Sequence, residues 1–154
     1  MTKTGHHLTG IGAALAAYGL AESQGLPVAH AFIFAFFGAT APDWLEIPKY
    51  WVNKRLSVIP HRTLTHWLPL WLILFAISFV NTSLPFELRS TFLGFSLGGL
   101  VHLLFDWPNP MGIPVIHPFK RHSLRRWPSG DYEYILVPAS WLLGLLVLVF
   151  TGSL

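Results

Sequence analysis

The sequence contains no cysteine and few charged residues. Without cysteine, disulfide bonds, thiolate zinc sites and a cysteine nucleophile are all excluded. Any metal bound by this chain must therefore use nitrogen and oxygen ligands. Charged residues make up 11% of the chain, whereas a soluble domain of ordinary composition has about a quarter. Because 53% of the 154 residues are hydrophobic, the composition predicts a single membrane-embedded domain over residues 1–154.

Five apolar runs, bounded by proline, glycine or charged residues, predict the helices of the protein. The runs cover residues 8–21, 28–42, 67–80, 91–105 and 134–150. We therefore expect an all-α fold, a polytopic membrane bundle of about five helices. Each run is shorter than the roughly 20 residues that cross a bilayer, so the helices should extend into their flanks, or the first two should form a shallow hairpin. Gly94 and Gly98, four residues apart, predict close helix packing.

The basic residues are distributed unevenly between the two sides of such a bundle. If all five helices span, nine of the ten Lys and Arg residues lie on one side, and the other side has only Arg89. The positive-inside rule then places the N-terminus in the cytoplasm and the C-terminus outside. The net charge of +3 comes from loops that would face anionic lipid. We therefore expect membrane lipids as partners and no nucleic acid.

Seven of the eight histidines gather on the basic side or one turn from its boundary, and only His30 falls opposite. His102 and Asp106 are four residues apart at the end of an apolar run. Both side chains therefore project from one helical face and can reach one ion. A buried His and Asp near a membrane is a functional hypothesis by default, and a structural hydrogen bond between them is the alternative.

His61 and His66 immediately precede the apolar run that opens at Trp67. A spacing of five residues does not suit one helix face, but it suits a loop that enters a helix, with Thr65 capping that helix and both rings turned inward. Arg62 between them offers a planar fork of donors that matches phosphate or carboxylate oxygens. The alternative is a basic anchor at the membrane interface, with Trp67 in its aromatic belt.

Acidic residues follow the second apolar run. Pro42 and Asp43 end the run, and Glu46 comes one turn later. Taken alone, Asp43 is expected to cap a helix over residues 44–52. Taken with the histidines, it is one of three helix ends that deliver His and Asp to one membrane face. The sequence therefore predicts a divalent metal site.

The ligand types narrow the choice of metal. Imidazole and carboxylate without thiolate suit zinc, which we expect first, and also manganese or iron. Six candidate ligands exceed the four that one tetrahedral zinc needs, so the set accommodates a dinuclear centre.

The order of these elements resembles a known family. The matching elements are Gly5-His6, Pro42-Asp43, His61-Arg62-x-x-Thr65-His66, His102-x-x-x-Asp106, Pro110-x-Gly112-x-Pro114 and Pro118. From Gly5 to about Pro128 the chain is similar to the LexA-regulated, membrane-bound, metal-dependent hydrolases of the bacterial inner membrane. The resemblance implies a multi-pass inner-membrane protein, a hydrolase activity and six metal ligands. These ligands would be His6, Asp43, His61, His66, His102 and Asp106.

Three positions depart from the family pattern. Glu46 stands where the family often has a second Asp, and we expect it to take that role. Asn109 stands where Thr is common. We place Glu46 and Asn109 in the catalytic set together with Arg62. His117 occupies a position that is usually apolar or aromatic, and its role as an extra ligand stays open, as do the roles of His7 and His122.

Residues and resemblance together predict metal-assisted hydrolysis at the cytoplasmic membrane face. The metal would lower the pKa of bound water, and Glu46 or Asp43 would take the proton. Arg62 would hold an anionic group together with a basic cluster, defined as Lys120, Arg121, Arg125 and Arg126. A phosphoester in a lipid headgroup is therefore the expected substrate. Two alternatives stay open: a non-enzymatic membrane protein with a structural or transport metal site, and a scaffold that docks a cytoplasmic partner on residues 120–126.

Overall fold

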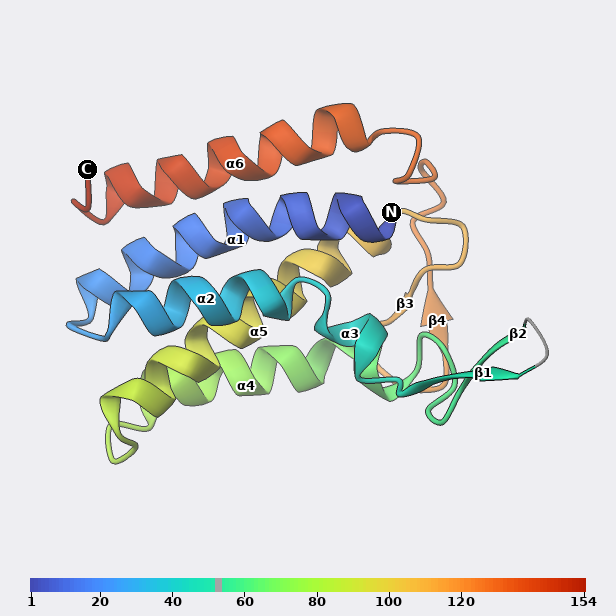
Figure 1. Ribbon diagram of the computed structural model, residues 1–154, viewed down its shortest axis with the longest axis horizontal. Helices are drawn as coiled ribbons and strands as arrows, with labels where there is room; N and C mark the ends of the chain where they lie inside the picture. Colours follow the sequence, from blue (N-terminus) through green and yellow to red (C-terminus); the bar gives the residue numbers. More distant parts are fainter. Residues whose placement is uncertain (52–53) are drawn as a thin grey trace.

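Five helices of eleven or more residues lie side by side in the computed structural model, which describes residues 1–51 and 54–154 (Figure 1). They are α1 (Lys3–Ser23), α2 (Val28–Gly38), α4 (Leu68–Val80), α5 (Phe86–Asp106) and α6 (Glu133–Phe150). Each helix covers most of one apolar run, so the predicted helix positions and the mainly helical fold are confirmed.

The helix α5 is at the centre of the bundle and packs against α1, α2 and α4, whereas α6 packs against α1. Among the described residues, α5 and α6 are long and apolar enough to cross a membrane, and α2 and α4 are apolar but shorter. Much of the apolar surface of α6 is exposed, as at Leu142, Leu143, Leu145 and Leu146. An apolar surface of this extent favours contact with lipid over contact with water.

Glycines allow α5 to approach α2 closely. A side chain at Gly94 would collide with the backbone carbonyl of Ala31, and one at Gly98 would collide with that of Ala35. The two helix backbones can therefore touch only because these positions lack a Cβ atom. The close helix packing predicted from the spacing of Gly94 and Gly98 is confirmed.

The connections fall at two opposite ends of the bundle (Figure 1). The N-terminus, the short helix α3 (Ala41–Trp44) and both β-hairpins lie at one end. The α1–α2 turn, the α4–α5 connection and the C-terminus lie at the other. This alternation agrees with the alternating loops that we assumed when assigning the Lys and Arg residues to the two sides of the bundle. The orientation of the bundle in a membrane stays a prediction.

A β-hairpin replaces the helix predicted over residues 44–52. The helix α3 ends at Trp44, and β1 (Pro48–Trp51) then pairs antiparallel with β2 (Lys54–Ser57). Residue 52 lies outside the described residues. The helix prediction was wrong because Pro48 lacks the amide N–H that a helix interior needs. Asp43 does not cap a helix either, since Thr40 precedes α3 as its N-cap.

The segment before α4 also differs from expectation. Thr65 does not cap α4: it lies in η1 (Leu64–His66), a single 3₁₀ turn, and Trp67 is the N-cap of α4. Pro69 in the first turn of α4 sets the start of the helix, because its fixed φ and missing N–H suit that position. After α5, β3 (Ile113–Pro114) pairs antiparallel with β4 (Arg121–His122), a second hairpin that the sequence did not predict.

Candidate metal centre

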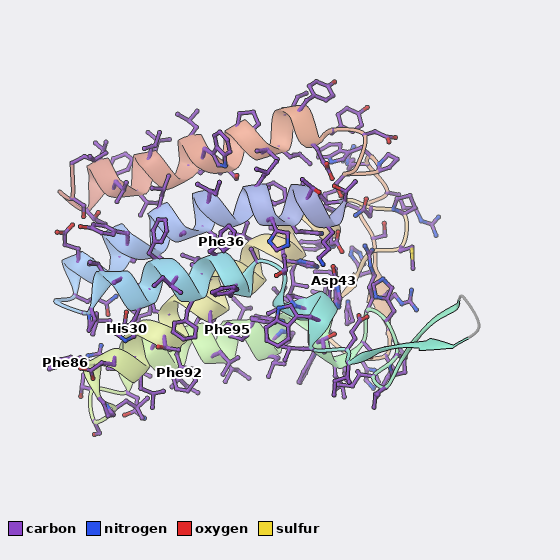
Figure 2. The ribbon with its side chains drawn as sticks, in the orientation of Figure 1. His30, Phe36, Asp43, Phe86, Phe92 and Phe95 are labelled. Carbon is purple, nitrogen blue, oxygen red and sulfur yellow. The ribbon has the colours of Figure 1, made fainter. Side chains whose placement is uncertain are left out.

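The predicted ligands meet at the end of the bundle that carries the hairpins. Figure 2 shows Asp43 at this end and His30 towards the opposite one. Candidate ligand atoms form three overlapping groups, and within each group they lie within 4.8 Å of one another. The groups are Asp43, Glu46, His61 and His66; His6, Asp43 and His102; and His66, His102 and Asp106. Every one of the six predicted ligands belongs to at least one group.

The imidazole of His102 is fixed by a contact with α2. Its Nδ1 donates to the carbonyl oxygen of Ala39 at 2.8 Å, so Nε2 is left with a lone pair. That Nε2 atom is buried, has no hydrogen-bond partner among the described residues and lies 3.7 Å from an oxygen of Asp106. A histidine whose Nδ1–H donates to a carbonyl oxygen, and whose Nε2 lone pair has no hydrogen-bond partner, has the arrangement of a metal ligand.

His66 has the same arrangement with different partners. Its Nδ1 lies 3.4 Å from Oε1 of Glu46 and 3.2 Å from the hydroxyl of Thr65. Its Nε2 is buried without a hydrogen-bond partner in the described structure, 3.6 Å from Oδ1 of Asp43. Burial, assisted by nearby His102, lowers the pKa of His66 to about 2. The ring is therefore neutral, which is the form that binds metal.

His6 completes a cluster of three buried rings. It stacks on His102 with ring centroids 3.7 Å apart, and the rings of His66 and His102 are 5.2 Å apart. Nε2 of His6 lies 3.6 Å from Oδ1 of Asp106, and its Nδ1 is buried without a hydrogen-bond partner in the described part of the chain. Three neighbouring imidazoles, from α1, η1 and α5, thus each have one buried nitrogen without a hydrogen-bond partner among the described residues.

Asp106 is held by one residue far from it in sequence, Arg62, and by one residue near it, Asn109. Arg62 donates from Nη2 to Oδ2 at 2.6 Å and from Nη1 to the carbonyl oxygen of Gly112 at 3.1 Å. Asn109 donates to Oδ1 at 3.0 Å, and its own Oδ1 accepts from the backbone N–H of Ser129 at 2.7 Å. Arg62 therefore holds a carboxylate of the protein, although we had expected it to hold a substrate anion.

Glu46 and His61 form the rim of the cluster. Glu46 is fully buried and accepts from Nδ1 of His61 at 2.8 Å and from the backbone N–H of Arg62 at 3.1 Å. The side chain of His61 is 41% exposed, and its ring contacts that of His66 at a centroid separation of 5.4 Å. Glu46 therefore orients both rings through their Nδ1 atoms.

The remaining histidines lie outside the three groups. His7 packs against Phe36, with ring centroids 5.8 Å apart. His117 follows β3 and His122 lies in β4, and both are exposed. All four residues of the basic cluster are exposed in the same connection between α5 and α6.

Three supporting groups were not predicted from sequence. They are the carbonyl of Ala39, the indole of Trp71, which donates to the carbonyl of Thr65 at 2.8 Å, and the backbone N–H of Ser129. Every residue has a backbone carbonyl and nearly every residue has an N–H, so no sequence signal marks the two backbone groups. Trp71 lies in an apolar run, where an aromatic ring is expected to pack in the hydrophobic core and to have no special role.

With this geometry established, the chain can be compared with known proteins. A family model described as YdjM inner membrane protein matches residues 1–153. The chain belongs to the YdjM inner membrane protein family. No curated protein and no solved structure matches it. The YdjM description confirms the predicted inner-membrane location. It names no activity.

Proposed function

We propose that this YdjM family protein binds divalent metal in the cluster and hydrolyses a phosphoester in a lipid headgroup at the cytoplasmic membrane face. The observation that carries the proposal is the pair of buried Nε2 atoms of His66 and His102, which lack hydrogen-bond partners among the described residues. Each lies beside a carboxylate, that of Asp43 or Asp106. Buried polar atoms are usually satisfied, and a cation would satisfy both nitrogens, with the neighbouring carboxylates balancing its charge.

The overlap of the three groups favours two metal ions. Asp43, His66 and His102 each belong to two of the groups, so neighbouring groups share a residue. The donors are imidazole nitrogens and carboxylate oxygens, which suit zinc, manganese or iron. Once bound, such ions supply a water of lowered pKa and stabilise negative charge on a phosphoryl oxygen.

The surrounding residues divide into separate roles. Asp43 is the carboxylate of the cluster with solvent access, since 31% of its side chain is exposed, and we assign it the proton from the attacking water. Glu46 and Asn109 are positioning residues, because one orients His61 and the other holds Asp106. Arg62 likewise positions Asp106.

Elemental analysis of the full chain, purified without a histidine tag, tests the metal proposal. We expect two metal ions per chain, a reduced content in His66→Ala and His102→Ala, and an unchanged content in His30→Ala. The last variant removes an imidazole from the opposite end of the bundle and is the matched control. A metal-free wild-type protein that also takes up no zinc or manganese on dialysis would overturn the proposal.

Hydrolysis requires its own assay. Zinc- or manganese-loaded protein should cleave a phosphodiester such as bis-p-nitrophenyl phosphate, or release headgroup from a phospholipid, and His66→Ala should lose this activity. If the metal is bound but wild type and His66→Ala are equally inactive, the site is structural and the enzyme proposal fails.

A further inference from the structure

Trp107 and the β3–β4 hairpin line a hollow of about 550 Å³. Its apolar lining is formed by Trp107, Val115 and Ile116. Its polar lining is formed by His117, Lys120, Arg121 and His122. Gly112 precedes the hairpin at φ +61°, and a side chain there would collide with the carbonyl of His122. The hairpin, and with it the hollow, therefore depends on a glycine at this position.

The polar lining offers hydrogen-bond donors. Nδ1 of His122 accepts from the indole of Trp107 at 3.1 Å, and Nδ1 of His117 accepts from the backbone N–H of Phe119 at 3.2 Å. A neutral imidazole that accepts at Nδ1 carries its proton on Nε2, so both rings are donors there, as are Lys120 and Arg121. Residues 107–130 contain no Asp or Glu. The hollow therefore suits an anion and not a metal ion.

The position of the hollow points to a lipid. Trp107 directly follows α5, whose residues Phe86–Asp106 form a candidate membrane span. A hollow that begins at the end of a span lies at the level of the lipid headgroups, where tryptophan is also enriched. Nearby, Ile116 is 85% exposed and Phe119 is 63% exposed. A ligand with a negative charge next to an apolar part would match both halves of this surface.

We propose that the hollow binds the headgroup phosphate of an anionic phospholipid. Lys120 and Arg121 contact the phosphate, His117 and His122 donate to its oxygens, and Ile116 lies against the glycerol and acyl part. None of the lining residues belongs to the three metal-ligand groups. The inference therefore stands whether or not the protein binds metal or hydrolyses a substrate.

Lipid binding by the full chain in a neutral detergent tests this proposal. Native mass spectrometry would follow the binding of dihexanoyl phosphatidylglycerol and of dihexanoyl phosphatidylcholine to protein stripped of lipid. We expect the anionic lipid to bind more tightly. The double variant Lys120→Gln with Arg121→Gln should weaken phosphatidylglycerol binding about 30-fold, from the contribution of two basic residues at an anionic surface.

The matched control replaces Arg125 and Arg126 by Gln. It removes the same charge from the same exposed connection but changes no residue that lines the hollow. Binding of phosphatidylglycerol should remain within about threefold of wild type, because neither side chain lines the hollow and salt screens charges that do not contact the ligand. Equal losses in both double variants, or a loss in neither, would overturn the proposal. So would effective competition by inorganic phosphate or by a single-stranded oligonucleotide, because the ligand would then be a free phosphate or a nucleic acid.

Discussion

Replacing Arg62 by Met removes a positive charge that faces Asp106 within the protein and leaves the N-terminal ammonium of Met1 facing it at 3.3 Å. The guanidinium is nearly buried, donates to Asp106 at 2.6 Å and also satisfies the carbonyl of Gly112. Breaking a buried ion pair by removing one partner costs about 3–5 kcal/mol. Because the N-terminal ammonium of Met1 still lies 3.3 Å from Oδ1 of Asp106, we expect a loss of about 3 kcal/mol, at the lower end of this range. Met is a suitable replacement because it keeps an unbranched side chain, and both residues meet the same strain at the φ of +56° found here.

Equilibrium unfolding of the metal-free protein in detergent measures this loss. Arg126→Met is the matched control, because that side chain is exposed, and its loss should stay within about 0.5 kcal/mol. A loss in Arg62→Met no larger than the control would refute the assignment of Arg62 as the counter-charge of Asp106. In zinc-loaded protein the loss should be smaller, because a bound cation would also compensate Asp106. An equal loss with and without zinc would argue that the metal does not reach this carboxylate.

Three further predictions concern the packing of the bundle, the support of the candidate metal centre and the orientation in the membrane. Gly98→Ala should destabilise the bundle by about 1–3 kcal/mol in the same unfolding assay, because the new methyl group meets backbone of α2, whereas Gly130→Ala has open space and should not. Trp71→Phe leaves the carbonyl of Thr65 without its donor, so it should cost about 1–3 kcal/mol and weaken metal retention. Ser83 lies in the α4–α5 connection, which the predicted orientation places outside the cytoplasm. In this chain without native cysteines, Ser83→Cys should therefore react with a membrane-impermeant maleimide in intact cells. Protection of Ser83→Cys from the reagent would overturn the predicted orientation.

The helices could be predicted because each is encoded locally. An apolar run bounded by Pro or Gly indicates one helix whatever it packs against, and the pair Gly94 and Gly98 even indicated a close contact. The hairpins escaped prediction because they are short. β3 has two residues, Ile113 and Pro114, too few for any alternation of polar and apolar positions to appear. In the segment after Trp44, Pro48 is a local signal against a helix.

The sequence could predict which residues gather at the candidate site, but not which of their atoms pair with one another. The types of residue and their position at helix ends predicted that His66 and His102 lie together, and the family resemblance added His6. The carbonyl of Ala39, 63 residues away in the chain, determines which nitrogen of His102 is left without a hydrogen-bond partner. The role of Arg62 likewise depends on a carboxylate 44 residues away. Such pairings arise from tertiary packing, and the sequence pattern around each residue does not contain them.

The structure also shows that Arg62 and the basic cluster lie in different surroundings, whereas the sequence predicted one shared role for them. Arg62 had been assigned with the basic cluster to hold one anion, because all five side chains were expected on one side of the membrane. In the structure Arg62 is turned inward to Asp106, whereas Lys120 and Arg121 line an exposed hollow. Both Nη atoms of Arg62 already donate within the protein and its Nε is buried, whereas exposed donors beside an apolar surface can contact a lipid. Substrate recognition and metal binding are therefore best sought in different residues.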